Sequence, residues 1–151
     1  MSPVTELEPA ECWKLLRGAA LGRVGISTPM GPRIIPVNHR VHDADILFRT
    51  TPASLLGTYA ADSELAFEVD HVDEPARQGW SVVALGKARL VEDMDEVTEI
   101  WLRGDPQPWA DGSRNVYLRL GVREISGRRV GGDLTPSTGP VSSLLASTFL
   151  G

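Results

Sequence analysis

The sequence predicts a mainly β (α+β) fold, in which a small antiparallel β-barrel of about six strands carries about three helices at its ends. Many short segments are rich in β-branched residues or alternate between apolar and polar residues, and the connections between them suit antiparallel neighbours. In addition, the chain has neither a GxGxxG motif after a strand nor a Walker-type loop, so a doubly wound nucleotide-binding sheet is not expected.

The composition is typical of one globular domain. The chain has 151 residues, of which 42% are hydrophobic, and this length is sufficient for a real core. Its 15 Lys and Arg residues against 20 Asp and Glu residues give a net charge of -5, which argues against nucleic acid or an anionic membrane as the main partner. The acidic N-terminus does not resemble a signal peptide and no apolar run has transmembrane length, so we expect a cytoplasmic protein.

The only cysteine, Cys12, excludes an intrachain disulfide and a cysteine metal cluster. It lies among apolar residues of a segment over 9–20 that we expect to be helical, because Pro9 suits the first turn and an apolar stripe follows. We therefore interpret Cys12 as a small buried hydrophobe. No histidine spacing typical of a metal site is present, and no metal is expected.

A strand over 22–28, a turn over 29–32 and a strand over 33–41 should follow. Pro36 cannot donate to a ladder, so the second strand should be an edge at this point or carry a bulge. The residues HDAD then form a turn into a strand over 46–50. A two- or four-residue loop gives one register, in which the facing pairs are Val41 with Ile46, His39 with Phe48, Asn38 with Arg49, and Val37 with Thr50.

The second half of the chain continues the pattern. Thr51 should cap a helix over 52–61, a strand over 64–71 precedes a loop over 73–79, and a long strand over 80–91 has Gly86 as a candidate bulge. A helix over 93–103, an irregular loop, and two strands over 114–120 and 122–130, interrupted near Gly121, complete the expected domain, residues 1–130. The tail, residues 131–151, is linker-like and then apolar.

One stretch, residues 33–57, concentrates polar side chains near an expected helix N-terminus. Such a terminus offers backbone N–H groups and a positive dipole to an anion. Thr50, Thr51 and Ser54 add hydroxyl donors, and Arg49 adds a guanidinium that can bind phosphate through two hydrogen bonds. The stretch therefore predicts a site for a planar, anionic ligand, although ordinary helix capping and a solvated Arg49 explain the same residues.

Histidines and acids offer two further sites. His39 lies on the apolar face of its strand and should be a core histidine with a satisfied ring, whereas His42 lies in a turn and should face solvent. Glu68 and Asp70 share one face of a strand, which allows a carboxylate pair for acid–base work or simply a solvated strand face.

The successive segments ECWKLLR, GRVGI, IIPVNHRV, ILFRT, LAFEVD, GWSVVALGKARLV and ISGRR resemble the pyridoxamine 5'-phosphate oxidase-like flavin-binding proteins, in particular their small actinobacterial-type members. The resemblance covers residues 7–130 in order. It implies a split β-barrel and a homodimer with two flavin mononucleotide (FMN) sites at its interface. It assigns the following residues to the cofactor: Pro36, Val37, Asn38, Phe48, Arg49, Thr50, Ser54, Leu55, Trp80 and Ser81. Trp80 and Ser81 should approach the ring from the partner subunit.

The chain departs from this family at one position. Relatives usually carry a basic residue after the small hydroxyl residue, in a pattern such as GTKL, whereas this chain has Leu55 after Ser54. Loss of one charge-assisted contact costs about 1.5–3 kcal/mol, or about one to two decades of affinity. A deazaflavin cofactor is therefore an alternative to FMN.

The resemblance implies a flavin-dependent oxidoreductase with a small-molecule substrate, in which the flavin exchanges a hydride and the protein supplies positioning and electrostatics. No side chain is singled out as a catalytic acid or base, and the substrate is not identified. The alternatives are a non-enzymatic protein of the same fold that binds flavin, deazaflavin or haem, and a cofactor-free dimeric relic.

Overall fold

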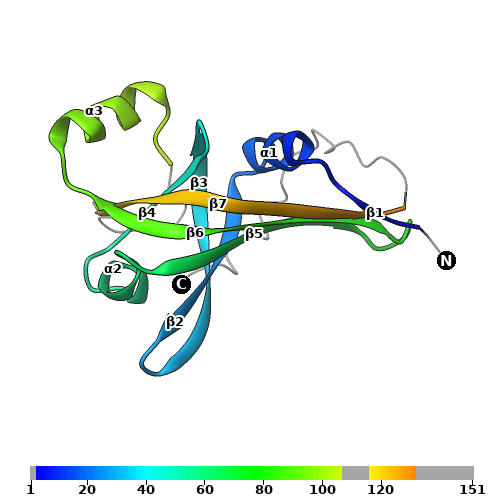
Figure 1. Ribbon diagram of the computed structural model, residues 1–151, viewed down its shortest axis with the longest axis horizontal. Coiled ribbons are helices and arrows are strands. Elements are labelled where there is room, and N and C mark those ends of the chain that lie inside the picture. The colour runs from blue at the N-terminus through cyan, green and yellow to red at the C-terminus, as the bar shows by residue number, and fades with distance from the viewer. Residues whose placement is uncertain (1–2, 107–115, 132–151) are drawn as a thin grey trace.

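The computed structural model describes residues 3–106 and 116–131 (Figure 1). Almost all of the predicted tail and the loop that contains Trp109 lie outside these residues. In chain order the elements are β1 (Val4–Glu6), α1 (Pro9–Gly18), β2 (Leu21–Thr28), β3 (Gly31–His42), β4 (Asp45–Thr50), α2 (Leu55–Tyr59), β5 (Glu64–Asp73), β6 (Gln78–Val91), α3 (Met94–Arg103) and β7 (Val116–Val130). In this part of the chain, no helix is long and apolar enough to cross a membrane.

Six strands close into a ring, which confirms the predicted antiparallel architecture. The order is β7-β4-β3-β2-β5-β6, and β6 pairs again with β7. The short strand β1 was not predicted from the sequence, and it lies outside the ring on the end of β7. Pairing between β2 and β5 covers only the segment from Arg23 to Gly25, whereas β2 and β3 stay paired down to their turn. The β2–β3 hairpin therefore projects from the body of the molecule (Figure 1).

The ring encloses the main core. Alternate residues of each strand point inward, as strand geometry requires, and α1 adds Cys12, Leu15 and Leu16 to this cluster. Cys12 is fully buried, so the prediction of a small buried hydrophobe is confirmed. The helix over 9–20 is confirmed as well, and it ends at Gly18.

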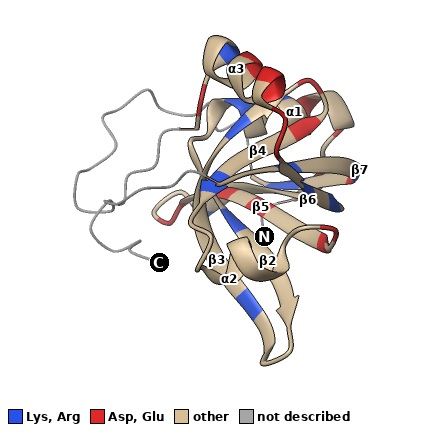
Figure 2. Cartoon of the chain, turned by 90° about the vertical axis from the view of Figure 1, so that its left-hand side faces the viewer, with Lys and Arg blue, Asp and Glu red and all other residues tan. Residues whose placement is uncertain are grey.

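A second apolar cluster lies on the outside of the ring, where α3 packs on the sheet. Val97 and Ile100 of the helix cover Leu47, Val91 and Tyr117. Acidic and basic residues are interspersed along the chain in this region (Figure 2). Arg119, for example, pairs with Glu96 of α3 at 2.8 Å and with Asp45 of β4 at 3.1 Å. Apolar packing and ion pairs thus hold α3 over β4, β6 and β7.

The strand β7 corrects one expectation. Residues 116–130 form one continuous strand, not two strands interrupted at Gly121, because β6 pairs with it on both sides of this glycine. The irregularity is taken up as a bulge, since Leu85 faces Glu124 and Gly86 faces Val122, which leaves Arg123 as the extra residue of β7. The predicted bulge near Gly86 is therefore confirmed, with the inserted residue on the partner strand.

The segment after β4 corrects a second expectation. The helix does not run over 52–61 from a Thr51 cap. Instead, Ser54 is the N-cap, and the short helix α2 covers only Leu55–Tyr59. The Ser54 side chain accepts a hydrogen bond from the Gly57 N–H at 3.0 Å, while Ser54 N–H donates to Thr51 O at 3.2 Å. Pro52 and Ala53 form this turn, so the first helical residue comes three positions later than predicted.

The β3–β4 register is confirmed for four pairs, from His42 with Asp45 to His39 with Phe48. The predicted extension to Asn38 with Arg49 and Val37 with Thr50 is wrong. Beyond His39, β3 pairs with β2, so Asn38 faces Leu21, while Arg49 and Thr50 pair with Tyr117 and Val116 of β7. Among the described residues, β3 therefore has a neighbouring strand on only one side at Pro36, in agreement with the predicted edge position.

Candidate functional site

The candidate site is built on the outer face of four neighbouring strands, β3, β2, β5 and β6. Directly paired residues share a face of a sheet, and three rungs cross all or most of these strands on the outside. These rungs are Ile34–Gly25–Ala66–Leu85, then Pro36–Arg23–Glu68–Val83, and then Asn38–Leu21 beside Asp70–Ser81. The structure therefore brings the predicted site residues Pro36, Asn38 and Ser81 onto one continuous surface.

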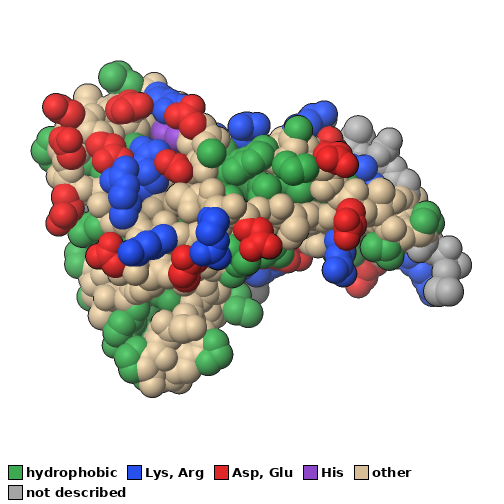
Figure 3. Space-filling view, in the orientation of Figure 1, with side chains coloured by type: hydrophobic (Ala, Val, Ile, Leu, Met, Phe, Trp, Pro, Cys, Tyr) green, Lys and Arg blue, Asp and Glu red, His purple; other side chains and the backbone are tan. Residues whose placement is uncertain are grey.

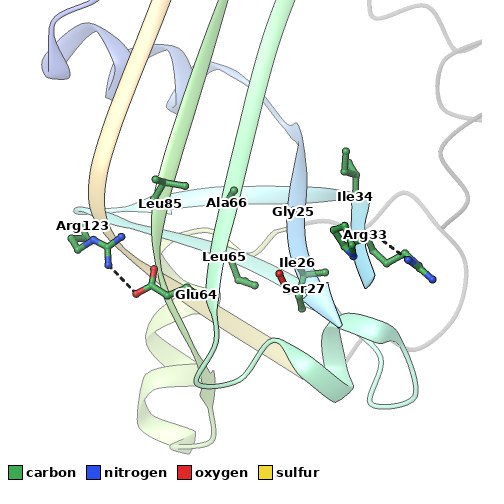
Figure 4. Close-up of a pocket in the computed structure, with 11 residues that line it drawn as sticks. Gly25, Ile26, Ser27, Arg33, Ile34, Glu64, Leu65, Ala66, Leu85 and Arg123 are labelled. Carbon is green, nitrogen blue, oxygen red and sulfur yellow. Dashed lines mark hydrogen bonds and ion pairs between the residues drawn. The ribbon is translucent and has the colours of Figure 1, made fainter. Parts of the chain in front are cut away.

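A groove of about 570 Å³ opens at the first of these rungs (Figure 4). It forms because β2 leaves β5 after Gly25, so Ile26 and Ser27 face Leu65 across a gap where the ladder has ended. Figure 4 shows that the wall on the β5–β6 side is apolar and ends at the ion pair of Glu64 with Arg123, 3.0 Å apart. The groove thus has an apolar body with a few polar groups at its ends, which is the usual character of a small-molecule site.

Small residues make room at this groove. A Cβ placed on Gly25 would meet nothing nearer than the Ala66 Cβ at 3.5 Å, which is an ordinary contact. Gly25 and Ala66 are paired on adjacent strands, so two short side chains leave a flat surface beside the bulkier Leu85 and Ile34. A planar ring laid on the sheet fits this surface, and sequence reasoning had not identified either residue. The available signal was a single small residue at an outward position of each strand, Gly25 in GRVGI and Ala66 in ELAFEVD.

An ion cluster occupies the middle of the outer face. Arg23 contacts Glu68 at 2.8 Å and Asp70 at 3.2 Å, so the two carboxylates noted in the sequence share one guanidinium. Burial, followed by the hydrogen bond and the charge of Asp70, raises the pKa of Glu68 above its ordinary value, while Arg23 opposes this effect. Glu68 therefore keeps a proton to a higher pH than an ordinary glutamate, on the same outer face as the groove. Arg23 was not predicted as a site residue.

Four of the predicted cofactor residues point into the ring instead. Val37, Phe48, Thr50 and Trp80 are at most 8% exposed, and all but Thr50 belong to the main hydrophobic cluster. Phe48 is completely enclosed. A ligand on the outer face of the protomer can contact only the small exposed part of these four side chains. Their part in binding stays a prediction of the family resemblance.

Arg49 does not lie beside Asn38 as the predicted register required. Its Nη1 lies 3.0 Å from Asp105 Oδ2, and its guanidinium lies over the Tyr117 ring at 4.9 Å. The Tyr117 hydroxyl completes the network by donating to Asp105 at 3.2 Å and accepting from the Trp101 indole at 2.8 Å. Arg49 thus holds the segment after α3 against the sheet.

Two of the three hydroxyl groups expected to bind phosphate, those of Thr50 and Ser54, are engaged within the chain. Ser54 Oγ donates to Thr51 O at 2.8 Å and lies 2.6 Å from Thr50 Oγ1. A hydroxyl has a single proton, so Thr50 must be the donor of the second bond. With Leu55 half-buried in place of a cation, the phosphate end of the predicted site does not fit a phosphate in this arrangement, whereas the groove fits a ring.

Both histidines of β3 are buried. His39 is 2% exposed and its Nε2 lies 2.9 Å from Leu16 O, which confirms the predicted core position, and burial lowers its pKa. Its ring is only partly satisfied, because Nδ1 has no hydrogen-bond partner among the described residues. The expectation that His42 faces solvent is wrong. His42 is 4% exposed, and its Nε2 lies 3.0 Å from Gly104 O, because the end of α3 packs over the β3–β4 turn. Burial also lowers the pKa of His42.

These features define the protein as a small split barrel, in which a hairpin leaves a six-stranded ring and opens a groove on its outer face. The chain belongs to the pyridoxamine 5'-phosphate oxidase family, whose model matches residues 8–129. The chain is 31% identical over 135 residues to an uncharacterized protein of Mycobacterium tuberculosis. The aligned region covers 86% of this chain and 88% of the relative.

Two solved structures have similar folds. The FAD binding protein from Mycobacterium smegmatis is 33% identical, with a TM-score of 0.71 over 83% of this chain and 98% of that one. A conserved protein of unknown function from Corynebacterium diphtheriae is 31% identical, with a TM-score of 0.71 over 85% and 98% of the two chains. The family and actinobacterial character indicated by the sequence motifs are thereby confirmed.

Proposed function

We propose that this protein binds a flavin, FMN in the first instance, with its ring in the groove beside Gly25 and Ala66, and that it acts as a flavin-dependent oxidoreductase. The groove carries the proposal, because it offers an apolar surface on the same outer face as Pro36 and Asn38, although none of the predicted cofactor residues is among those that line it. The name of the M. smegmatis protein adds support, since that relative is a FAD binding protein of the same fold. A bound flavin would supply hydride transfer, and a small-molecule substrate would share the groove.

The residues of this chain would position the ring and exclude water from it. Pro36, Asn38 and Ser81 lie on the same outer face as the groove, and Glu68 stands between them. Because the hydroxyls of Thr50 and Ser54 are engaged internally, little affinity should come from the phosphate. FMN, FAD and riboflavin should therefore bind with similar dissociation constants, and a deazaflavin with the same ring remains an alternative ligand.

The site should be completed by a second copy of the chain. The β2–β3 hairpin that forms one wall of the groove carries Met30 and Ile34, which are 58% and 74% exposed. On the face seen in Figure 3, the projecting hairpin shows hydrophobic side chains and no charged ones. Burial of such a surface stabilises association by about 25 cal/mol per Å². A homodimer that covers the hairpin would close the groove over a bound ring.

The visible spectrum of the freshly purified protein, followed by titration with FMN, FAD and riboflavin, tests the proposal. Bound flavin gives two visible bands, a deazaflavin gives one fluorescent band, and haem gives a Soret band. Gly25→Val should weaken flavin binding at least about tenfold by filling the groove. Gly18→Ala is the matched control, because no atom lies within 4 Å of a Cβ at that helix end. A colourless protein that binds no added flavin would overturn the proposal.

Two further measurements separate the parts of the proposal. Light scattering should give the mass of a dimer, and Ile34→Asp should reduce it to that of a monomer, whereas a monomeric wild-type protein would contradict the dimer. Oxidation of added nicotinamide dinucleotide by the flavin-loaded protein should distinguish an enzyme from a carrier. A loaded protein whose flavin no nicotinamide donor reduces would be a binding protein of this fold.

A further inference from the structure

A second hollow, of about 220 Å³, lies away from the groove, between the end of α1, the edge of β3 and the end of α3. Three arginines from three different elements line it, namely Arg17, Arg40 and Arg103. The chain as a whole carries a net charge of -5, so this concentration of guanidinium groups runs against the average of the molecule.

The three arginines differ in what they already bind. Arg103 is engaged by Asp43 at 3.1 and 3.2 Å and by Glu99 at 3.3 Å, so it forms a wall of the hollow. Arg17 has no carboxylate partner within the described part of the chain, and its guanidinium lies 5.9 Å from the centre of the Trp13 ring. Arg40 is exposed and likewise forms no ion pair with a described residue. Two positive charges therefore remain available to an incoming anion.

The backbone of β3 adds a donor. Pairing with β2 ends at Asn38, so the edge of β3 that faces α1 has no neighbouring strand beyond this point among the described residues. His39 N–H lies on this edge, where it donates to Ala20 O at 3.1 Å. Since N–H groups two residues apart along a strand point to the same side, the N–H of Val41 also points toward α1, and Val41 lines the hollow.

Two buried histidine rings complete the lining of the hollow. His39 and His42 both line it, and each places Nε2 against a carbonyl oxygen, which requires that Nε2 carries the proton. Their Nδ1 atoms are buried and have no hydrogen-bond partner in the described residues, so the donors that the hollow offers are the guanidinium groups and the β3 backbone. An oxyanion such as a phosphate group matches a site with guanidinium and N–H donors.

We propose that the hollow between α1, β3 and α3 is a binding site for a phosphate group, either inorganic phosphate or a small phosphate monoester, held by Arg17, Arg40 and the Val41 N–H. The site is separate from the flavin groove and does not depend on flavin binding. It would give the protein a second small-molecule ligand.

Calorimetric titration of the full-length protein with inorganic phosphate and with glycerol phosphate, at constant ionic strength, tests the proposal and separates the two sources. The Arg17→Gln/Arg40→Gln double variant should weaken binding about 10- to 100-fold. Lys14→Gln is the control for the charge of α1, because it removes one positive charge from an exposed position about one turn from Arg17 and should leave the affinity unchanged. A thermal shift with phosphate should be lost in the same double variant.

Three results would overturn the site. The first is a wild-type protein that binds neither compound, and the second is equal weakening by Lys14→Gln, which would indicate a diffuse charge effect. The third is competition between phosphate and FMN, with phosphate binding lost in Ser54→Ala, which would place the anion at the flavin site instead. Phosphate binding in a protein that fails to bind flavin would leave this proposal standing while the proposed flavin function fails.

Discussion

Arg23 Nη1 lies 2.8 Å from Glu68 Oε1, across a direct pairing of β2 with β5. The same nitrogen lies 3.2 Å from Asp70 Oδ1, so one guanidinium is shared by two carboxylates that crowd each other on the same strand face. This arrangement makes Glu68 the member of the cluster whose protonation responds most directly to its neighbours.

The pKa of Glu68 should therefore depend on Asp70 and on Arg23 in opposite directions. Asp70→Asn removes the charge that opposes ionisation, so it should lower the pKa of Glu68, whereas Arg23→Gln should raise it further. Carboxyl-carbon NMR titration measures both. A Glu68 pKa that does not move in Asp70→Asn would contradict the influence of Asp70 on Glu68.

The raised pKa also predicts a pH dependence of stability. The folded protein binds a proton at Glu68 more tightly than the unfolded chain does. The contribution of Glu68 to stability therefore falls as the pH rises above 4.5, the ordinary pKa of a glutamate, and through the raised pKa of Glu68 in the folded protein. Glu68→Gln lacks this fall. The free energy of unfolding of Glu68→Gln minus that of the wild type should thus increase with pH in this window and be constant above it, as measured by urea unfolding at several pH values.

Ser54→Ala should destabilise the protein by about 0.5–2 kcal/mol, the usual cost of losing an N-cap. The substitution removes the acceptor of the Gly57 N–H and also the partner of the buried Thr50 hydroxyl. Thr58→Ala is the control, since the Thr58 hydroxyl is exposed and only donates back to Ser54 O, so its loss should cost less than about 0.5 kcal/mol. Urea unfolding measures both variants, and equal effects would contradict the capping role.

Gly86→Ala should destabilise the ring by about 1–3 kcal/mol, as overpacking in a tight site does. Its Cβ would lie 1.9 Å from Gly121 O, in the backbone of the strand opposite, where the bulge brings β6 and β7 together. Gly25→Ala on β2 is the comparison, because a Cβ there makes only ordinary contacts and should change stability little. Equal stability of both variants in thermal unfolding would contradict this prediction, because it would show that the strands move apart at Gly86 without loss of stability.

Much of this fold follows from local patterns in the sequence. The β3–β4 turn was placed correctly because Val41 and Ile46 flank the four residues that contain the turn, and the alternation of the two strands leaves one register that buries the apolar face. Alternation alone does not reveal where one neighbour is exchanged for another. The ladder of β3 passes from β4 to β2 at residues 38 and 39, so the predicted pairing of Asn38 with Arg49 failed although the turn was right.

The site was less predictable than the fold, for a related reason. Ser54 and Thr51 are both good caps, and only the turn through Pro52 decides between them. Arg49 was assigned to an anion because Asp105, its partner, lies 56 residues further along the chain. The groove depends on how far β2 and β5 remain paired, which no single segment encodes. The sequence shows which polar and charged side chains are present. Which of them contact one another depends on how the strands close into a ring.

Arg49 provides the sharpest test of how the proposed flavin site works. If Arg49 binds the phosphate, Arg49→Gln should weaken FMN binding about 10- to 100-fold and leave riboflavin unaffected. Because its guanidinium is committed to Asp105 and the Tyr117 ring, we expect instead that Arg49→Gln changes the affinities for FMN and riboflavin by the same factor. The substitution should also destabilise the protein by about 1–3 kcal/mol, since it leaves the half-buried Asp105 without its cation.

Asp105→Asn is the matched variant for Arg49→Gln, because it removes the same ion pair from the other side and keeps the Arg49 charge. A double-mutant cycle should give a coupling energy of about 0.5–3 kcal/mol between the two positions, measured by urea unfolding. Fluorescence titration with both flavins measures the binding arm. The opposite result would be weaker binding of FMN but not of riboflavin in Arg49→Gln, with a coupling energy near zero. It would show that Arg49 leaves Asp105 when flavin binds, and that the phosphate end of the flavin site forms only around the ligand.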